Sequence, residues 1–462
     1  MKITISNQLH LSAIPETLRS ELIAKLQFSN PKWIENERMG RWNKGVPKTL
    51  KFYRRSGTDN MIVPRGLMRQ LIIMSRSHNE SFTIVDRRRN APDTSFEFNG
   101  ELRPFQAQAV RAMLARDFGT LSAPTGSGKT IMALYMIAQR RQPTIIVVHS
   151  KELALQWMER IETFLSIPKG QIGFIGDGKK VTGDKITVAL VQSLYKCAAE
   201  VAPHVGHLIV DECHRAPSRT FTEAVTVFDT RFMLGLSATP WRRDQLSKLI
   251  FWHLGDVHHD ISAADLVASG QILSIEVVYR ATTFVPFADP IGDYSRMLSE
   301  LTQNDERNRL IAADVFHEAV TQERPGVCLV LSDRKLHCQV LQAILKHKHH
   351  VDSEVLTGDL NEEQRAGIIE RLNKGEVKVL VATGQLIGEG FDCPRLSTLF
   401  FATPVRFNGR VLQYLGRVLR PSEGITQAKV YDYVDEEVAP LTAAARARQK
   451  VYEGLTAVPS ES

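Results

Sequence analysis

Short apolar segments alternate with amphipathic segments in two successive stretches of the chain, and this alternation constrains the fold most. In the first stretch the apolar segments are GTLSA, TIIVVHS, ITVALVQ, HLIVDE and FMLGLSA. In the second they are GVCLVLS, SEVLTG, VKVLVATG, STLFFATP and KVYDYV. Near-continuous apolar strands separated by amphipathic helices are typical of parallel sheets that are covered on both faces. The pattern therefore predicts two tandem α/β domains.

The first 95 residues differ in pattern and in charge. A strand-like KITISNQLHL leads into a helical PETLRSELIAKLQF, and a β-rich stretch precedes a second helix. This region has 17 Lys and Arg against 8 Asp and Glu, whereas the rest of the chain has 41 against 43, so the excess behind the net charge of +7 lies here. We expect a small basic α+β domain at residues 1–95, α/β domains at 96–285 and 286–440, and a closing helix or tail at 441–462.

Composition and short patterns exclude several other classes of protein. The chain has 462 residues, of which 43% are hydrophobic, and such a chain can build two or three packed domains. Its apolar runs are far shorter than the roughly 20 residues of a membrane span. The amino terminus lacks the apolar segment of a signal peptide. Five cysteines without a CxxC pair argue against a zinc site or a disulfide framework. We therefore expect a cytoplasmic protein without a membrane partner.

The segment APTGSGKT, residues 123–130, lies between the first apolar strand and a helix. In the Walker A pattern G-x-x-x-x-G-K-[ST], backbone N–H groups and a helix amino terminus surround bound phosphates. Ala123 stands at the first glycine of the pattern, where the strand ends and close approach to a phosphate is not needed. We expect Lys129 to bind the β- and γ-phosphates and Thr130 to ligate Mg²⁺. The other expected ATP-binding residues of this loop are Pro124, Thr125, Gly126, Ser127 and Gly128. An ordinary turn before a helix is the alternative.

A second candidate element is HLIVDECH, residues 207–214, in which a strand delivers two adjacent carboxylates to an edge of the sheet. Ligands of doubly wound folds bind at the carboxyl ends of the strands. We expect Asp211 to hold the water shell of Mg²⁺ and Glu212 to orient or deprotonate an attacking water. An acidic pair at a strand end could otherwise be a helix N-cap.

Two later segments complete an ordered set of motifs. Ser237 and Thr239 follow another buried strand in LSATP, and QYLGRVLRP places Arg417 and Arg420 on one helical face in the second α/β domain. An arginine supplied across an interface accelerates phosphoryl transfer by roughly 10³- to 10⁵-fold. The ordered set APTGSGKT, DECH, SAT and QYLGRVLR resembles motifs I, II, III and VI of superfamily 2 helicases, and the likeness covers about residues 100–435.

Within that superfamily the chain is most similar to the group of XPB and UvsW, which includes branch-migration helicases of T4-type and T5-type phages. The segments LRPFQ, DECHR and SATPWRRD carry this likeness. The RRD at 242–244 departs from the R-E-D that follows motif III in XPB, so a strand-separating role for it stays open. The resemblance implies two RecA-like domains behind the basic α+β domain, with ATP and Mg²⁺ as cofactors.

The resemblance also implies roles for further residues. Gln413 joins the catalytic arginines, and His214 joins Ser237 and Thr239 in coupling hydrolysis to movement. The implied further nucleotide-binding residues are Arg103, Gln106, Gly390 and Asp392. The implied contacts with the nucleic-acid backbone are Ser150, Lys151, Gln192, Ser193 and Thr383. For each of these residues taken alone, a loop or helix cap is the alternative.

The basic amino-terminal region mixes aromatic side chains, including Trp33 and Trp42, with many cations. Phosphate contact combined with stacking on exposed bases requires this mixture. The cations that we expect to contact nucleic acid are Arg41, Lys51, Arg54 and Arg55. A solvated basic face over an aromatic core is the alternative for each of them.

These features and the resemblance together imply an ATP hydrolase coupled to DNA unwinding. We expect a monomeric motor that unwinds or branch-migrates forked and branched DNA in replication, recombination or repair, within a bacterium or a phage-infected cell. Two other functions stay open. One is an RNA helicase, and the other is a protein that binds nucleic-acid structures under ATP control without unwinding them.

Overall fold

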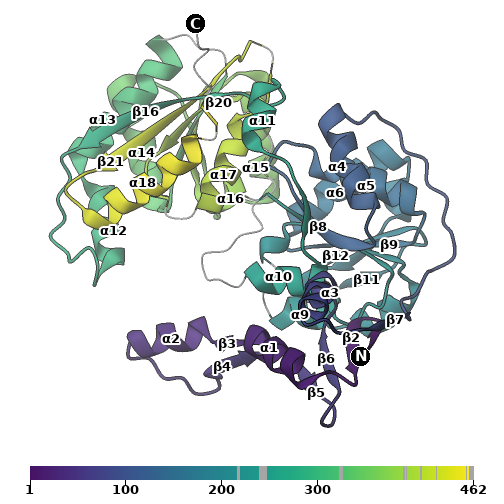
Figure 1. The fold of residues 1–462 in the computed structure, drawn as a ribbon. Helices are drawn as coiled ribbons and strands as arrows, with labels where there is room; N and C mark the ends of the chain where they lie inside the picture. The colour runs from purple at the N-terminus through teal and green to yellow at the C-terminus, as the bar shows by residue number, and fades with distance from the viewer. Residues whose placement is uncertain are drawn as a thin grey trace, which may run out of the picture. The chain divides into compact units, whose positions relative to one another are not determined.

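The computed structural model describes the chain except for residues 216–218, 239–246, 322–325, 389–390, 392, 406–407, 423, 454 and 457–462. The described chain divides into two compact units (Figure 1). Unit 1 consists of Met1–Ala123 and Gly128–Asp260, and unit 2 of Pro124–Ser127 and Ile261–Ser462.

The amino-terminal part of unit 1 is built on a sheet that has five strands among the described residues, in the order β5-β6-β2-β1-β7. These strands are β1 Lys2–Ile5, β2 Gln8–Ser12, β5 Arg54–Arg55, β6 Met61–Pro64 and β7 Thr83–Asp86. The other elements of this part are α1 Glu16–Leu26, β3 Gln27–Ser29, α2 Pro31–Arg38, β4 Thr49–Lys51, η1 Arg65–Leu67 and α3 Met68–Ser77. Alternate residues of a strand share one face, and Ile3, Leu9 and Leu11 are accordingly buried together with Leu18 and Leu22 of α1.

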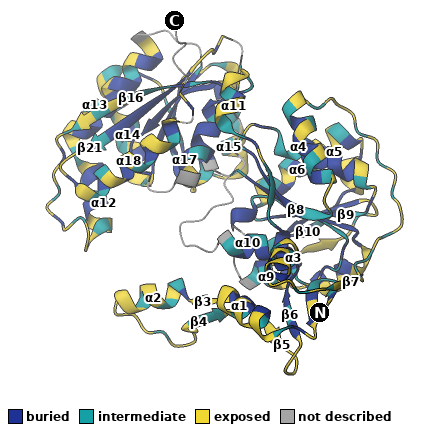
Figure 2. Ribbon diagram, viewed as in Figure 1, coloured by how far each residue is buried: buried dark blue, intermediate teal, exposed yellow. Residues whose placement is uncertain are grey.

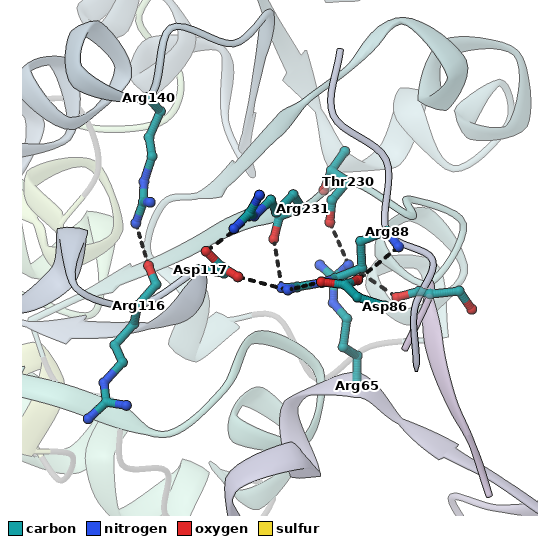
Figure 3. A network of polar contacts seen from close by, with 9 residues as sticks. Arg65, Asp86, Arg88, Arg116, Asp117, Arg140, Thr230 and Arg231 are labelled. Carbon is teal, nitrogen blue, oxygen red and sulfur yellow. Dashed lines mark hydrogen bonds and ion pairs between the residues drawn. The ribbon is translucent and has the colours of Figure 1, made fainter. Parts of the chain in front are cut away.

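Buried arginines join this part to the rest of unit 1 (Figure 3). Arg65 donates from Nη1 to the carbonyl of Thr230 at 2.7 Å, and Arg88 forms ion pairs with Asp86 at 2.6 Å and with Asp117 at 2.7 Å. Burial, together with the nearby charge of Arg88, lowers the pKa of Arg65 to about 9. Because these partners come from both parts, the amino-terminal part is anchored to the sheet that follows it.

The larger sheet of unit 1 has eight strands in the described chain, in the order β11-β10-β12-β9-β13-β14-β8-β15. Its pairs are parallel except for β10 with β11, which are antiparallel. The strands are β8 Phe118–Ser122, β9 Thr144–Val148, β10 Gly173–Gly176, β11 Lys179–Val181, β12 Ile186–Leu190, β13 His207–Val210, β14 Phe232–Ser237 and β15 Val257–Asp260. The central strands β9, β12 and β13 are buried at every position, as expected for a sheet covered on both faces.

Helices cover both faces of this sheet (Figure 1). Helix α5 contacts α4 and α6, and α7 to α10 contribute to the core cluster on Ile145, Val147 and Leu208. The helices are α4 Pro104–Leu114, α5 Lys129–Arg140, α6 Lys151–Leu165, α7 Val191–Leu194, α8 Ala198–Val201, α9 Arg219–Val225 and α10 Ser247–Leu254, with the short η2 Lys169–Gln171, η3 Ala202–His204 and η4 Cys213–Arg215. Leu249 and Trp252 of α10 also belong to the core of the amino-terminal part, so the two parts share apolar packing.

Unit 2 contains a second parallel sheet, with six strands among the described residues in the order β16-β21-β20-β17-β19-β18. The strands are β16 Ile275–Thr282, β17 Val327–Ser332, β18 Glu354–Leu356, β19 Val379–Thr383, β20 Leu396–Phe401 and β21 Ala428–Asp435. The helices are α11 Ala263–Ala268, α12 Tyr294–Gln303, α13 Asp305–Phe316, the π-helical η5 His317–Thr321, α14 Lys335–His349, α15 Glu362–Lys374, α16 Gly384–Gly388, α17 Asn408–Val418 and α18 Ala439–Glu453.

The two parallel sheets confirm the predicted α/β fold, and the second sheet includes β16, which precedes the predicted boundary between the two α/β domains. The prediction assigns residues up to 285 to the first α/β domain. In the structure β16 pairs in parallel with β21 along its whole length, from Ile275 opposite Ala428 to Thr282 opposite Asp435. This strand therefore belongs to the second sheet, and unit 1 ends at Asp260. The sequence pattern did not separate them because β16 is only partly buried and its side chains alternate.

No helix in the described part of the chain is long and apolar enough to cross a membrane.

Candidate active site

The glycine-rich loop follows β8 and leads into α5, as the motif requires. Ala123 is fully buried, and its N–H donates to the carbonyl of Ser237 at 2.9 Å, so alanine fits the end of the strand. Gly126 and Gly128 have φ angles of 88° and 83°, and Gly128 is the N-cap of α5. Residues with a side chain rarely adopt this left-handed backbone conformation, which explains why glycine occupies both positions. The first N–H groups of α5 have no acceptor within the helix, and this geometry suits an anion.

Side chains of the loop hold its shape. The Nζ of Lys129 donates to the carbonyl of Ala123 at 3.0 Å, so the side chain folds back along the loop. Ser127 donates from its Oγ to the carbonyl of Pro124 at 2.7 Å. These two bonds curve the loop into the form expected of a phosphate-binding loop, and the Lys129 side chain lies against it.

Gln106, one of the expected nucleotide-binding residues outside the loop, lies beside this loop. Its Oε1 accepts the N–H of Arg103 at 2.9 Å at the start of α4, and its side chain is buried. A Cβ built on Gly128 would lie 2.4 Å from the Nε2 of Gln106. The absence of a side chain at Gly128 therefore also makes room for the glutamine.

The predicted carboxylates follow β13 at the same edge of the sheet. Asp211 accepts the N–H of Glu212 on Oδ1 and the indole N–H of Trp157 on Oδ2, both at 2.8 Å. Trp157 is a buried residue of α6 and is not one of the site residues predicted from the sequence. Burial, followed by the adjacent charge of Glu212, raises the pKa of Asp211.

Glu212 has a φ of 47°, a left-handed value that is uncommon for residues other than glycine. Its Oε2 lies 3.1 Å from the Nδ1 of His214. Burial raises the pKa of this carboxyl group, but the hydrogen bond from His214 and the charge of Lys129 outweigh burial and lower it to about 2. Glu212 is therefore an anion at neutral pH, as a group that orients or deprotonates water must be.

His214 also links this carboxylate to the next motif. Its Nδ1 lies 3.1 Å from the Oγ of Ser237, and Ser237 is buried at the end of β14. Because the Ser237 carbonyl accepts the N–H of Ala123, short contacts connect Glu212 to the glycine-rich loop. The structure thus brings together two of the three predicted coupling residues. Thr239 lies outside the described residues.

The expected backbone-binding residues of unit 1 lie at the ends of two neighbouring strands. Ser150 caps α6, because its Oγ accepts the N–H of Leu153 at 3.4 Å, and Lys151 pairs with Asp177 at 3.2 Å. Gln192 donates to the carbonyl of His149 at 2.9 Å. The structure also places Ser193 in the same short helix, α7. These residues therefore have local structural roles and share one edge of the sheet.

Unit 2 carries the other predicted site residues. Gln413 and Arg417 lie one turn apart on α17, and Thr383 ends β19. The prediction that Arg420 shares a helical face with Arg417 is wrong, because α17 ends at Val418 and Arg420 lies two residues beyond it. The N–H of Leu273 donates to the carbonyl of Leu419 at 2.8 Å just past the helix. Gly390 and Asp392 lie outside the described residues.

The basic candidates of the amino-terminal part are all exposed. Lys51 ends β4, Arg54 and Arg55 form β5, and Arg54 donates from Nη2 to the Oε1 of Gln8 at 2.7 Å. Arg41 lies in the loop between α2 and β4. Their side chains are thus accessible to a polyanion.

Comparisons with known families match both sheets of the structure. The family described as type III restriction enzyme, res subunit, matches residues 99–242. The family described as helicase conserved C-terminal domain matches residues 310–422. The first segment holds the glycine-rich loop and the carboxylate pair, and the second holds Gln413, Arg417 and Arg420.

Individual relatives are similar over most of the chain. The DNA 3'-5' translocase XPB2 of Sulfurisphaera tokodaii is 28% identical over 70% of this chain and 79% of its own length. The probable helicase D10 of Escherichia phage T5 is 26% identical over 68% of this chain and 67% of its own.

The solved structure of Saccharomyces cerevisiae Dbp5 bound to RNA and ADP BeF3 shares the fold. It aligns with a TM-score of 0.53 and 17% identity, over 78% of this chain and 90% of that one. T4 UvsW covers 99% of this chain and 98% of its own, with 18% identity and a TM-score of 0.44.

Proposed function

We propose, on the premise that the chain belongs to the superfamily 2 helicases of the XPB/UvsW-like group, that it unwinds or branch-migrates forked and branched DNA. Membership of this family makes it an ATP-hydrolysing helicase. We place its activity in replication, recombination or repair, as a monomeric motor in the cytoplasm of a bacterium or a phage-infected cell.

The observation that carries the proposal is the edge of the larger sheet in unit 1. A glycine-rich loop with an inward-folded Lys129 and an ionised Glu212 bonded to His214 lie at the carboxyl ends of β8 and β13. In this arrangement Lys129 would bind the β- and γ-phosphates of ATP, and Glu212 would orient or deprotonate the attacking water. The glycines and the start of α5 would surround the phosphates.

The side-chain oxygens at this edge of the larger sheet suit Mg²⁺, which prefers carboxylates, hydroxyls and water as ligands. Thr130, in the first turn of α5, and Asp211 would hold the ion, Asp211 through its water shell. Both oxygens of Asp211 already accept one N–H each, but every carboxylate oxygen can accept a second bond. When bound, the ion would neutralise negative charge on the phosphates.

The second sheet would complete the site. We assign Gln413, Arg417 and Arg420 to the developing charge on the γ-phosphate, and Gly390 and Asp392 to sensing the nucleotide. Closure and opening of two domains around ATP become directed movement if each domain also grips the nucleic-acid backbone in turn. For that grip we propose Ser150, Lys151, Gln192 and Ser193 in unit 1 and Thr383 in unit 2.

DNA is the polymer we favour, because the relatives named XPB2 and XPB are described as a DNA translocase and a DNA helicase. The exposed cations Arg41, Lys51, Arg54 and Arg55 would bind its phosphates. Such contacts carry little sequence information and weaken with salt.

The test is ATP turnover by the full chain with forked DNA, four-way DNA, duplex DNA and RNA, together with strand displacement on the same substrates. We expect the largest stimulation with forked or four-way DNA, and displacement of a strand. Stimulation by RNA alone would identify an RNA helicase. Binding with ATP-dependent affinity but no displacement would identify a structure-binding protein.

The arginines have their own test. Arg417→Ala and Arg420→Ala should each lower turnover while ATP affinity stays within a few fold of the wild type, because these groups act on charge that develops during reaction. An equal loss of ATP affinity would argue against this role.

A further inference from the structure

An exposed basic arm projects from the amino-terminal part of unit 1. We define the arm as residues 27–51, which comprise β3, α2, the connecting loop and β4 (Figure 2). Residues 27–55 contain eight Lys and Arg and two acidic residues. The arm contains no buried position except Asn30, so its surface faces solvent along nearly its whole length.

The loop at the tip of the arm is ordered by asparagine side chains. Asn36 donates to the side chain of Asn43 at 3.0 Å, and Asn43 donates to the carbonyl of Trp33 at 3.3 Å. Asn30 closes the base of the loop by donating to the carbonyl of Pro47 at 2.9 Å. The N–H of Arg41 donates to the carbonyl of Asn36 at 2.7 Å. Internal bonds of this kind hold the loop in one shape before any ligand binds, which lowers the entropy that binding must overcome.

Trp42 lies on this ordered loop with 87% of its surface exposed. A large aromatic side chain in water forgoes roughly 1.5–3 kcal/mol of burial free energy. The other tryptophan of the arm differs, because the Nζ of Lys48 lies 4.9 Å above the ring of Trp33. Trp42 is flanked by the exposed cations Arg41 and Lys44. An indole between cations on a rigid loop matches what a stacked nucleic-acid base requires.

The root of the arm is fixed to the motor part of unit 1. Phe28 and Phe52 stack at 5.7 Å, and Trp252 of α10 packs against them at 6.1 and 5.4 Å. The Nζ of Lys248, also on α10, lies 3.4 Å from the ring centre of Phe28. In the sequence α10 follows the SATPWRRD segment. The arm is therefore oriented by the domain that holds the glycine-rich loop.

We propose that Trp42 stacks on an unpaired base at the branch point of a DNA fork, while the neighbouring cations bind its phosphates. This inference rests on the proposed function and names the part of unit 1 that distinguishes a branch from a plain duplex. The charge of the arm selects the occupant, because its six cations against two acidic residues leave an excess of four cations, which attracts a polyanion and repels a second copy of the arm. A duplex offers no free base face at its centre, whereas a branch with unpaired nucleotides does.

Stacking and phosphate contact can be separated by salt. Stacking adds a factor to affinity that salt hardly changes, whereas each lost phosphate contact flattens the dependence of log affinity on log salt. Trp42→Ala should weaken binding to a fork with unpaired bases roughly 10-fold at every salt concentration, with an unchanged slope. Trp42→Phe should recover most of the loss. Arg41→Ala should flatten the slope.

The matched control is Phe287→Ala, which removes an aromatic side chain that is 99% exposed in unit 2. Phe287 lies near Asp289 and its backbone N–H bonds to Glu300, so its surroundings are acidic. We expect this variant to bind the fork like the wild type. Melting temperatures of all variants show that the fold is kept, as expected for side chains so exposed.

The experiment measures fork, single-strand and blunt-duplex affinity for the wild type and these variants, with 2-aminopurine at the branch reporting stacking. The inference is supported if Trp42→Ala lowers fork affinity but not duplex affinity and abolishes the fluorescence change. It is overturned if Trp42→Ala and Phe287→Ala bind the fork equally well, or if the loss is the same on duplex. A wild type that binds and displaces no DNA would overturn the proposed function instead.

Discussion

Each of the two parallel sheets carries a pair of carboxylates, buried in unit 2 and half-buried in unit 1, and the pairs differ in what stabilises them. On β21 in unit 2, Asp432 accepts two bonds from Arg448, at 2.8 and 2.5 Å, and Asp435 pairs with Arg307 at 2.9 Å. After β13 in unit 1, Asp211 instead accepts N–H groups of Trp157 and the backbone, as described above. The first pair is neutralised by permanent cations of its own domain. The second pair feels the charge of Lys129, but N–H donors are the partners of Asp211, whose oxygens keep acceptor capacity for a ligand.

The backbone differs in the same direction. The β21 carboxylates lie within a regular strand, whereas Glu212 holds a left-handed φ of 47° just after one. Residues held in sparsely populated backbone conformations cluster at functional sites, because surrounding structure must maintain them. Burial of a carboxylate alone therefore does not mark an active site. The kind of partner and the local backbone separate a stabilising pair from a reactive one.

The functional difference between the two pairs is tested most strongly by neutralising one carboxylate in each. Glu212→Gln should lower ATP turnover roughly 10²- to 10⁴-fold, the usual contribution of a general base, and should still bind ATP. Asp435→Asn should lower the melting temperature and leave the turnover of the folded protein within a few fold. Turnover and ATP binding, measured on both variants, decide the matter. Full turnover in Glu212→Gln would refute the assignment.

Lys129→Ala tests the loop beside that carboxylate. It removes the cation that we expect on the β- and γ-phosphates, and turnover should fall about 10²- to 10³-fold. Unlike Glu212→Gln, it should also weaken ATP binding, because the contact exists before the reaction. ATP binding by calorimetry distinguishes the two variants. Equal ATP affinity in both would argue that the lysine does not contact the nucleotide.

The next largest effect is on stability, and it comes from removing Arg448, the partner of Asp432. Arg448→Met leaves Asp432 as a buried charge without its cation, and breaking such a pair destabilises a protein by about 3–5 kcal/mol. The double variant Arg448→Met with Asp432→Leu removes both charges and should recover much of that loss. Denaturant unfolding of the two variants measures the difference. A single variant as stable as the wild type would show that the pair is not needed for folding.

Each unit also has a buried histidine that makes its stability depend on pH. His207 at the start of β13 and His337 in α14 both have their pKa lowered to about 3, chiefly by burial. As pH falls below about 6.5, the unfolded chain binds a proton that the folded chain does not, so stability is present above pH 6.5 and declines toward pH 3. For His207 alone the decline amounts to about 2 kcal/mol at pH 5.

His207→Phe keeps an apolar ring of similar size against Phe232, whose ring centre lies 6.2 Å away. Its unfolding free energy should change less between pH 7 and pH 5 than that of the wild type, by the amount above. If the unfolding free energies of the two proteins changed equally between pH 7 and pH 5, His207 would bind its proton as readily in the folded chain as in the unfolded chain.

The sequence predicts one half of the candidate site better than the other. The loop and the pair Asp211 and Glu212 are identifiable because their motifs are contiguous and end buried strands, and such strands meet at one edge. The contact of Glu212 with His214 is also local. By contrast, Trp157 reaches Asp211 from a helix 54 residues earlier, and only the packing of α6 against the sheet brings them together.

The fold shows the same division. Parallel sheets follow from buried apolar strands, but the assignment of β16 does not, because pairing between Ile275 and Ala428 joins segments far apart in the chain. The sequence also does not predict that Arg65 and Arg88 anchor the amino-terminal part (Figure 3). A basic residue in a basic region reads as surface, whereas Arg65 is only 2% exposed. This anchoring also means that deleting residues 1–95 would expose the apolar core around Trp252, so point variants of the arm are the better test of DNA binding.

The smallest effect we expect comes from Trp157→Phe, which removes one N–H donor and keeps the aromatic volume. Without that bond the pKa of Asp211 should rise further, since the indole N–H is one of the groups that lower it. Turnover should fall about 10-fold at neutral pH, a loss of roughly 1.4 kcal/mol, and the acid limb of its pH profile should move to higher pH. Ile161→Val, a fully buried change one turn along α6, controls for packing and should leave both unchanged. If the two variants gave the same pH profile, Trp157 would be a packing residue, and the contrast between the two carboxylate pairs would rest on Glu212 and its histidine alone.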